Sequence, residues 1–107
     1  MTGGESADAH AALGHALIRY FPGNAAVLIR SHERRWCSAT FSGRRHLFVF
    51  DVDGQGGSDA RRRVGQLCDQ EFALTGHLVA DVCVVEFAES VDQPMRLEIE
   101  ALTVEVQ

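Results

Sequence analysis

The strongest constraint on the fold lies between His46 and Glu86. In this stretch an apolar run leads through an acidic turn and a glycine-rich loop, and a second apolar run extends from Leu78 to Phe87. Between the two runs, apolar residues recur at helical spacing from about Asp59 to Leu74. Two apolar strands joined through a helix form a crossover, and the helix must then lie on one face of a sheet. The stretch therefore predicts an α+β domain.

The residues before this stretch predict one more helix and a meander. Apolar residues return every three or four positions from Ala7 to Phe21, and Pro22-Gly23 ends the pattern. Apolar or alternating runs with short polar connections follow, as in an antiparallel meander. The expected strands span Ala25–Ser31, Arg34–Phe41 and Leu47–Val52.

A last strand is predicted from Arg96 onward. Its alternation changes phase after Ala101, which a β-bulge or a change of hydrophobic partner would explain. The element order is then α-β-β-β-α-β-β in one domain, residues 1–107. With a right-handed crossover, the fourth strand lies parallel beside the first. We expect a two-layer sandwich, in which a five-stranded, mostly antiparallel sheet of order 3-2-1-4-5 carries both helices on one face.

The sheet face without helices bears on the oligomeric state. It would present Trp36 and part of the strand Leu78–Phe87, which is more apolar surface than a small monomer usually exposes. We therefore predict a homo-oligomer, most simply a two-fold dimer packed through the sheet or through the last strand.

Charge is divided along the chain, whose net charge is −5. Residues 30–63 carry eight arginines and four acidic residues, a balance of +4, whereas residues 64–107 carry nine acidic residues and Arg96, a balance of −8. We expect the two parts to attract each other across one solvated surface. The acidic total argues against a nucleic-acid partner.

Other features of the sequence bear on the compartment. No apolar run approaches membrane-spanning length, and the N-terminus lacks the basic lead of a secretory signal. The three cysteines are odd in number and far apart, which favours a reducing compartment over a disulfide framework. We expect a cytoplasmic protein with no membrane partner.

The sharpest motif runs from Phe48 to Gly54, an apolar strand that ends in Asp-x-Asp-Gly. It resembles the first motif of the haloacid-dehalogenase phosphohydrolases. The resemblance implies Asp51 as nucleophile and Asp53 as acid/base. The family's threonine is replaced by Gln55, and the chain has no lysine for the phosphate-binding position. A hydrolase is therefore the third hypothesis. Laid on a calcium loop, the same stretch has Arg62 where the bidentate glutamate belongs.

A helix start flanked by arginines follows the glycine-rich loop. Backbone amides at a helix N-terminus suit an anion or phosphate, so a small anionic ligand is the second hypothesis. The alternative is that Gly54–Gly57 only turns a strand into a helix capped by Ser58. His32 and Glu33 are expected to end the first strand on the same rim of the sheet as this loop. The residues expected to bind the ligand are Gly56, Gly57, Ser58, Arg61, Arg62, His32 and Asp51.

Asp81 interrupts an apolar face of the strand Leu78–Phe87. A buried carboxylate needs a partner or a raised pKa, so Asp81 is the buried carboxylate of interest, with an aspartate that reaches water as the alternative. His10 and His15 are five residues apart, do not share a helix face, and are expected to face solvent. No catalytic residue, metal or cofactor is predicted. The first hypothesis is a non-enzymatic module that oligomerises or binds a protein partner.

Overall fold

A computed structural model describes residues 8–21, 23, 25–53, 58–90 and 93–106. These described residues form two α-helices, a short 3-10 turn and five strands. In order they are α2 (Ala9–Tyr20), β1 (Ala26–Cys37), β2 (Ser42–Val52), α3 (Ser58–Gln66), η2 (Leu67–Asp69), β3 (Ala73–Leu74), β4 (His77–Ser90) and β5 (Gln93–Glu105).

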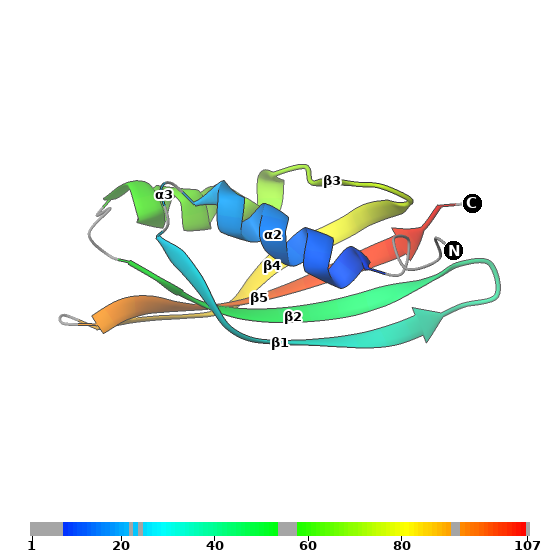
Figure 1. Ribbon diagram of the computed structural model, residues 1–107, viewed down its shortest axis with the longest axis horizontal. Helices are drawn as coiled ribbons and strands as arrows, with labels where there is room; N and C mark the ends of the chain where they lie inside the picture. Colours follow the sequence, from blue (N-terminus) through cyan, green and yellow to red (C-terminus); the bar gives the residue numbers. More distant parts are fainter. Residues whose placement is uncertain (1–7, 22, 24, 54–57, 91–92, 107) are drawn as a thin grey trace.

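The five strands form one sheet in the order β1-β2-β5-β4-β3, and every neighbouring pair is antiparallel. The predicted two helices and five-stranded, antiparallel sheet are confirmed. The predicted order 3-2-1-4-5, with two parallel neighbours, is wrong. The last strand, β5, folds back from β4 and inserts beside β2, so the crossover through α3 joins two parallel strands that have β5 between them (Figure 1).

The predicted first two strands are one strand, β1. His32, Glu33 and Arg34 do not turn the chain but pair with residues 45–47 of β2. Their polarity has another cause, because β1 is an edge strand and most of its side chains are exposed. The only register shift in this pair lies between Leu28 and Arg30. The fifth strand is instead the two-residue β3, joined to β4 by a turn in which Gly76 has a positive φ of 77°.

Helix α3 is shorter than the predicted helix from Asp59 to Leu74. It ends at Gln66, and the backbone becomes extended at Gln70 after the 3-10 turn. Phe72 still packs against the core, but from outside the helix. Arg63 therefore lies in the last turn of α3, where its guanidinium donates a hydrogen bond to the Tyr20 carbonyl at 2.8 Å. A cation at the C-terminal end of both helices is favourable for their dipoles.

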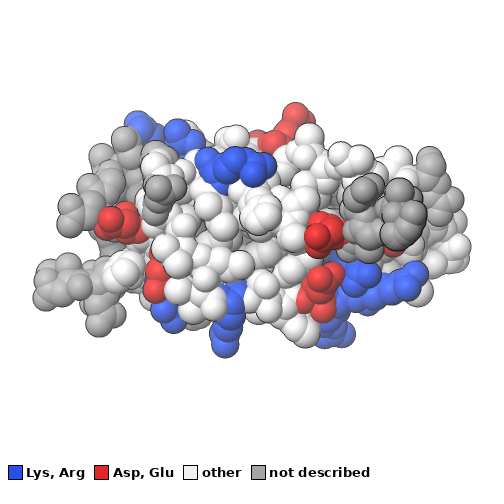
Figure 2. All heavy atoms as spheres, in the orientation of Figure 1, with Lys and Arg blue, Asp and Glu red and all other residues white. Residues whose placement is uncertain are grey.

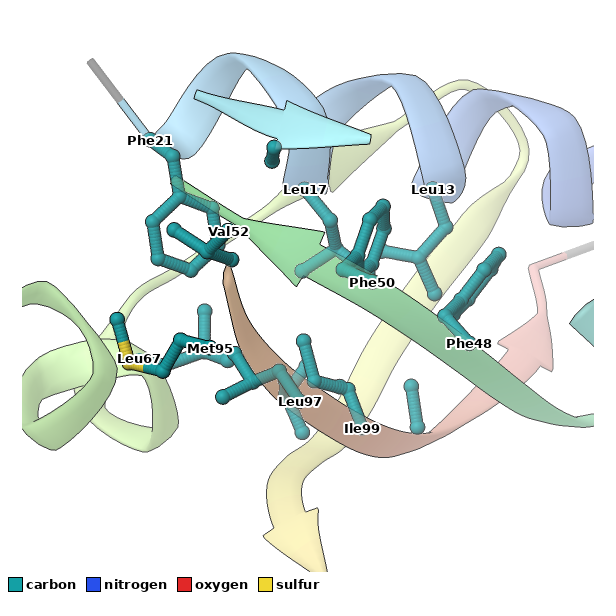
Figure 3. Close-up of a cluster of buried hydrophobic side chains, with 13 residues drawn as sticks. Leu13, Leu17, Phe21, Phe48, Phe50, Val52, Leu67, Met95, Leu97 and Ile99 are labelled. Atoms are coloured by element: carbon teal, nitrogen blue, oxygen red, sulfur yellow. The ribbon is translucent and has the colours of Figure 1, made fainter. Parts of the chain in front are cut away.

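Both helices lie on the same side of the sheet, and none of the elements labelled in Figure 1 covers the opposite side. Leu13 and Leu17 of α2 project toward Phe50 of β2, while Leu97 of β5 completes the centre of the core (Figure 3). The fully buried apolar side chains are Leu13, Leu17, Phe21, Phe48, Phe50, Val52, Leu67, Leu97 and Ile99. Since β2 alternates, these positions also define which of its residues face away from the helices.

The change of phase in β5 is not a bulge in its ladder with β2, which runs from Gly43 to Val52 without a shift. Alternate residues of β5 up to Ala101 meet the core, and Thr103 continues that face as a buried polar residue. Leu102 and Val104 lie on the opposite face. The strand therefore keeps the same face toward the core throughout, and the apolar side chains after Ala101 are those of the opposite face.

Candidate functional site

We call the sheet face that is turned away from the helices the open face. Residues paired in register lie side by side on one face of a sheet, so the pairings give rows that cross β1, β2, β5 and β4 in that order. The first row is Arg34, Arg45, Leu102 and Asp81. The second row is His32, Leu47, Glu100 and Cys83.

The two rows divide charge across the open face. Arg34 and Arg45 lie on the β1–β2 half, whereas Asp81 and Glu100 lie on the β5–β4 half, and all four side chains are exposed. Figure 2 shows arginine side chains gathered over the end of the β1–β2 hairpin. The basic middle and acidic C-terminal part of the sequence thus become the two halves of one surface.

A shallow hollow of about 720 Å³ lies at the centre of these rows. Half-buried Leu47 and Leu102 lie in it between the two charged halves. Cys83 also lines the hollow; burial, followed by nearby Asp81, Cys68 and Glu100, raises the pKa of its thiol. The hollow therefore holds two apolar side chains and a thiol that is neutral at neutral pH, with Arg45 and Glu100 beside them.

A third row, at the β1–β2 hairpin end of the open face, begins with Trp36 and Gly43 and contains a close contact with the backbone of β5. Trp36 lies across Gly43, and its indole Nε1–H donates a hydrogen bond to the Thr103 carbonyl at 3.2 Å. A Cβ atom on Gly43 would lie 1.8 Å from that carbonyl oxygen, so this position of β2 requires glycine. The same row continues through Val104 to Leu78, which is 59% exposed. Apolar surface thus extends from the hollow to this end.

A chain of hydrogen bonds lies on the other side of the sheet, under α2. His10 Nε2 is 2.9 Å from Ser31 Oγ, and the two Nδ1 atoms of His10 and His46 are 2.9 Å apart. His46 Nε2 is 2.9 Å from Thr103 Oγ1. If His46 donates to Thr103, His10 donates to His46 and Ser31 donates to His10; the opposite direction satisfies the same groups. The His10 ring also stacks on Phe48, with ring centroids 4.6 Å apart.

His10 and His46, the two histidines of this hydrogen-bonded series, are neutral at neutral pH. Burial lowers the pKa of His46 to about 4, and the neighbouring His10, Arg44 and His77 add to the effect. Burial also lowers the pKa of His10, with Glu33 and Asp8 opposing it. An uncharged pair can share one proton across the Nδ1–Nδ1 contact, whereas two imidazolium rings would both donate there.

Ser31, His10 and His46 have the spacing of a nucleophile, a base and an orienting group. In hydrolytic triads, however, the third group stabilises the imidazolium that forms on the base. His46 is neutral and resists a positive charge, so it does not supply that stabilisation. No carboxylate is hydrogen-bonded to either histidine in the described part of the chain. The arrangement fits a structural contact that fixes α2 on the sheet.

The predicted anion site is only partly within the described residues. Gly56 and Gly57 lie outside them, as do Gly54 and the side chains of Ser58 and Arg61, so an anion at this loop stays a prediction. Arg62 is on α3 with an exposed side chain.

The prediction that His32 and Glu33 end a strand, at the rim where β2 ends, is wrong. His32 is in the middle of β1 opposite Leu47, whereas Asp51 is opposite Val27, five residues further along. Because of the register shift, these five residues of β1 lie along four residues of β2, which span about 13 Å. Asp51 instead binds Arg96 in a two-point ion pair, with Arg96 Nε to Oδ1 at 2.7 Å and Nη2 to Oδ2 at 3.0 Å.

Asp81 is exposed, so the prediction of a buried carboxylate is wrong and the alternative of an aspartate that reaches water holds. A register shift between Val79 and Asp81 is the reason, because it moves Asp81 from the face that Val79 shares with the core to the open face.

The buried histidine pair was missed, and His10 was wrongly expected to face solvent. Two local signals point to the pair: His10 precedes Leu13 and Leu17 at helical spacing, and His46 continues the alternation of Phe48 and Phe50.

Within the described residues, no three histidine, cysteine, aspartate or glutamate side chains are placed to hold a metal ion. None of the described helices is long and apolar enough to cross a membrane. Comparison with protein-family models, curated proteins and solved structures finds no match to this chain.

Proposed function

We propose that this chain is a non-enzymatic module that works by oligomerising, or by binding another protein, through the open face of its sheet. The observation that supports this most is the exposed face itself, where an apolar centre around Leu47 and Leu102 lies between a basic and an acidic half. The proposal takes the domain as a two-layer unit whose second sheet face is its interface.

The composition of the open face suits recognition of a protein. Its centre offers apolar area whose burial stabilises a complex by about 25 cal/mol per Å². Charged side chains around such a centre contribute mainly to specificity and to the rate of encounter. In the hydrogen-bonded histidine pair under α2, His46 does not stabilise a positive charge on His10, which favours binding over catalysis.

The dimensions of the open face limit the affinity. Four strands about 4.8 Å apart, with alternate positions of β2 from Gly43 to Asp51 about 6.8 Å apart, cover roughly 650 Å². Standard protein interfaces bury about 800 Å² on each partner, so the contact belongs at the low end of the range. We therefore expect association in the micromolar range, visible only when protein concentration is varied.

The test is light scattering coupled to size exclusion over a wide range of protein concentration. We expect a monomer at low concentration and a larger species at high concentration. Leu47→Arg, at the centre of the open face, should shift that transition to higher concentration. Phe41→Arg replaces an apolar side chain that is 59% exposed at the hairpin tip and should leave it unchanged. Circular dichroism confirms that both variants are folded. A strict monomer at every concentration would contradict the oligomerising role.

A further inference from the structure

We propose that the occupant of the open face is a second copy of this chain, related to the first by a two-fold axis that runs parallel to the strands between β2 and β5. This inference rests on the proposed function and adds the partner and its orientation. The observation behind it is the opposite charge of the two halves of the open face, with Arg34 and Arg45 on one and Glu100 and Asp81 on the other.

The charges at the outer strands cannot neutralise each other within one chain. Arg34 on β1 and Asp81 on β4 are separated by three strand spacings, which is about 14 Å. Arg34, Arg45, Asp81 and Glu100 form no ion pair within the described part of the chain. A partner surface with acidic residues opposite the arginines and basic residues opposite the carboxylates would pair these four side chains. A second copy of the open face, turned over, presents its charges in this order.

Two simple two-fold arrangements stack one open face on another, and charge separates them. An axis across the strands places β1 over the partner's β1, so Arg34 and Arg45 meet the partner's arginines. An axis along the strands places β1 over the partner's β4 and β2 over the partner's β5. Like charges in contact cost several kcal/mol at an interface, so the axis along the strands is favoured.

In this arrangement each row lies over the same row of the partner, with the strands in the opposite order. Arg34 lies opposite the partner's Asp81, and Arg45 lies over the partner's Leu102 within reach of the partner's Glu100. Both contacts occur twice by symmetry. Leu47 and Leu102 gather around the axis, and the hollow in each face leaves room for the arginine side chains of the other copy. The contact is isologous, so it closes at a dimer and does not propagate.

Pairing of the two copies through the free edge of β1 is less favourable. An antiparallel β1–β1 contact centred on His32 would set Arg30 opposite the partner's Arg34, because the two lie equally far from the centre. Cross-strand pairs of like charge are destabilising. The open face thus remains the better surface for self-association.

A charge-reversal cycle, read by sedimentation equilibrium, tests the arrangement. Arg34→Glu and Asp81→Arg should each weaken the dimer by about tenfold, since each turns two attractions into two repulsions. The double variant, with both charges exchanged, should return to within about threefold of the original dissociation constant. Arg35→Glu is the matched control. Arg35 is exposed on the same strand but on the opposite face, so it should change little.

Cross-linking gives an independent measurement. Cys83 lies in the row of His32 and would face the partner's His32. In a background with Cys37→Ser and Cys68→Ser, His32→Cys should allow a short bismaleimide to link the introduced thiol to Cys83 of the other copy. The background without His32→Cys should give no cross-linked dimer.

The outcomes separate the two proposals. Rescue by the double reversal together with the expected cross-link supports the arrangement. A dimer without rescue, or a Cys83–Cys83 link in the background protein, overturns the arrangement and leaves the module standing. A protein that never self-associates overturns the second copy and the oligomerising role together.

Discussion

His46 and its neighbour Thr103 are buried polar residues in a core made mainly of apolar side chains, and both ring nitrogens of His46 are satisfied, by His10 and by Thr103. Buried polar groups are usually paired in this way, because a lost hydrogen bond in the interior costs about 1–3 kcal/mol. The contact ties the first turn of α2 to the centre of the sheet, and it also makes stability sensitive to pH.

The free energy of unfolding should decrease in acid. The pKa of His46 is about 4 in the folded protein and 6.5 in the unfolded chain, so the unfolded state binds more protons between these values. Stability is complete above pH 6.5 and is lost as the pH falls toward 4, by up to about 3 kcal/mol. The lowered pKa of His10 acts in the same direction.

Urea unfolding near neutral pH and near pH 4 measures this loss. His46→Gln should remove most of the pH dependence, although it is less stable at neutral pH. His15→Gln, at an exposed position of the same helix as His10, should keep the dependence. An equal loss in acid for His46→Gln and the unmodified protein would contradict the assignment.

Gly43 is a second position, after His46, where a single substitution should change stability, because the backbone of β5 lies directly against it. Gly43→Ala should lower the free energy of unfolding by about 2–3 kcal/mol, because the added methyl group meets backbone of β5 and cannot be relieved by a side-chain movement. Gly65→Ala is the control. No atom lies within 4 Å of its added Cβ, and alanine favours the helix by about 1 kcal/mol. Thermal unfolding should therefore move in opposite directions for the two variants.

Among the elements, α3 is the least able to form alone, since it has nine residues and isolated helices of that length are unstable in water. Its contact with the end of α2 supplies part of the missing stability. Arg63 donates to the Tyr20 carbonyl, its guanidinium lies 5.5 Å from the Tyr20 ring centroid, and the Tyr20 hydroxyl donates to the Arg63 carbonyl.

Arg63→Ala should destabilise the protein by about 1 kcal/mol and increase amide hydrogen exchange in α3 more than elsewhere. Arg35→Ala removes an exposed arginine from β1 and should stay within about 0.5 kcal/mol of the original stability. Equal effects of the two substitutions on exchange in α3 would show that the contact with Tyr20 contributes nothing.

For the whole molecule, the sheet converts a charge division along the chain into a charge division across a surface. The basic segment forms β1 and β2, and the acidic segment forms β4 and β5, which lie on the other half of the same sheet. Among the described residues of the outer strands, Arg34 of β1 and Asp81 of β4 lie too far apart to pair within one molecule and form no other ion pair. A second copy that is turned over is therefore a fitting partner.

The proposed dimer should weaken as salt increases. Between about 0.1 M and 1 M salt the Debye length falls from about 10 Å to about 3 Å, which screens the ion pairs between the copies. The net charge of −5 on each copy opposes association, but that repulsion acts over longer distances and is screened first. Sedimentation equilibrium at the two salt concentrations should give a larger dissociation constant at the higher one. A tighter dimer in high salt would indicate an apolar contact without charge pairing.

Several parts of the fold and of the site could be predicted from local pattern. Helix α2 follows from the spacing of Leu13 and Leu17, and the core face of β2 follows from the alternation of Phe48 and Phe50. The exposure of Asp81 could not be predicted, because it depends on a register shift that only the pairing with β5 reveals. The anion site predicted at Gly56 and Gly57 lies outside the described residues.

The sequence by itself determined the α+β class, the positions of α2 and β2, and the division of charge, because periodicity and composition are local properties. Only the tertiary structure decided that β5 inserts between β2 and β4, that residues 26–37 form one edge strand, and that His10 meets His46. The polar turn expected at His32–Arg34 illustrates the difference. Polar residues are compatible with a turn and with a solvent-exposed edge, and the choice depends on which strands lie beside them.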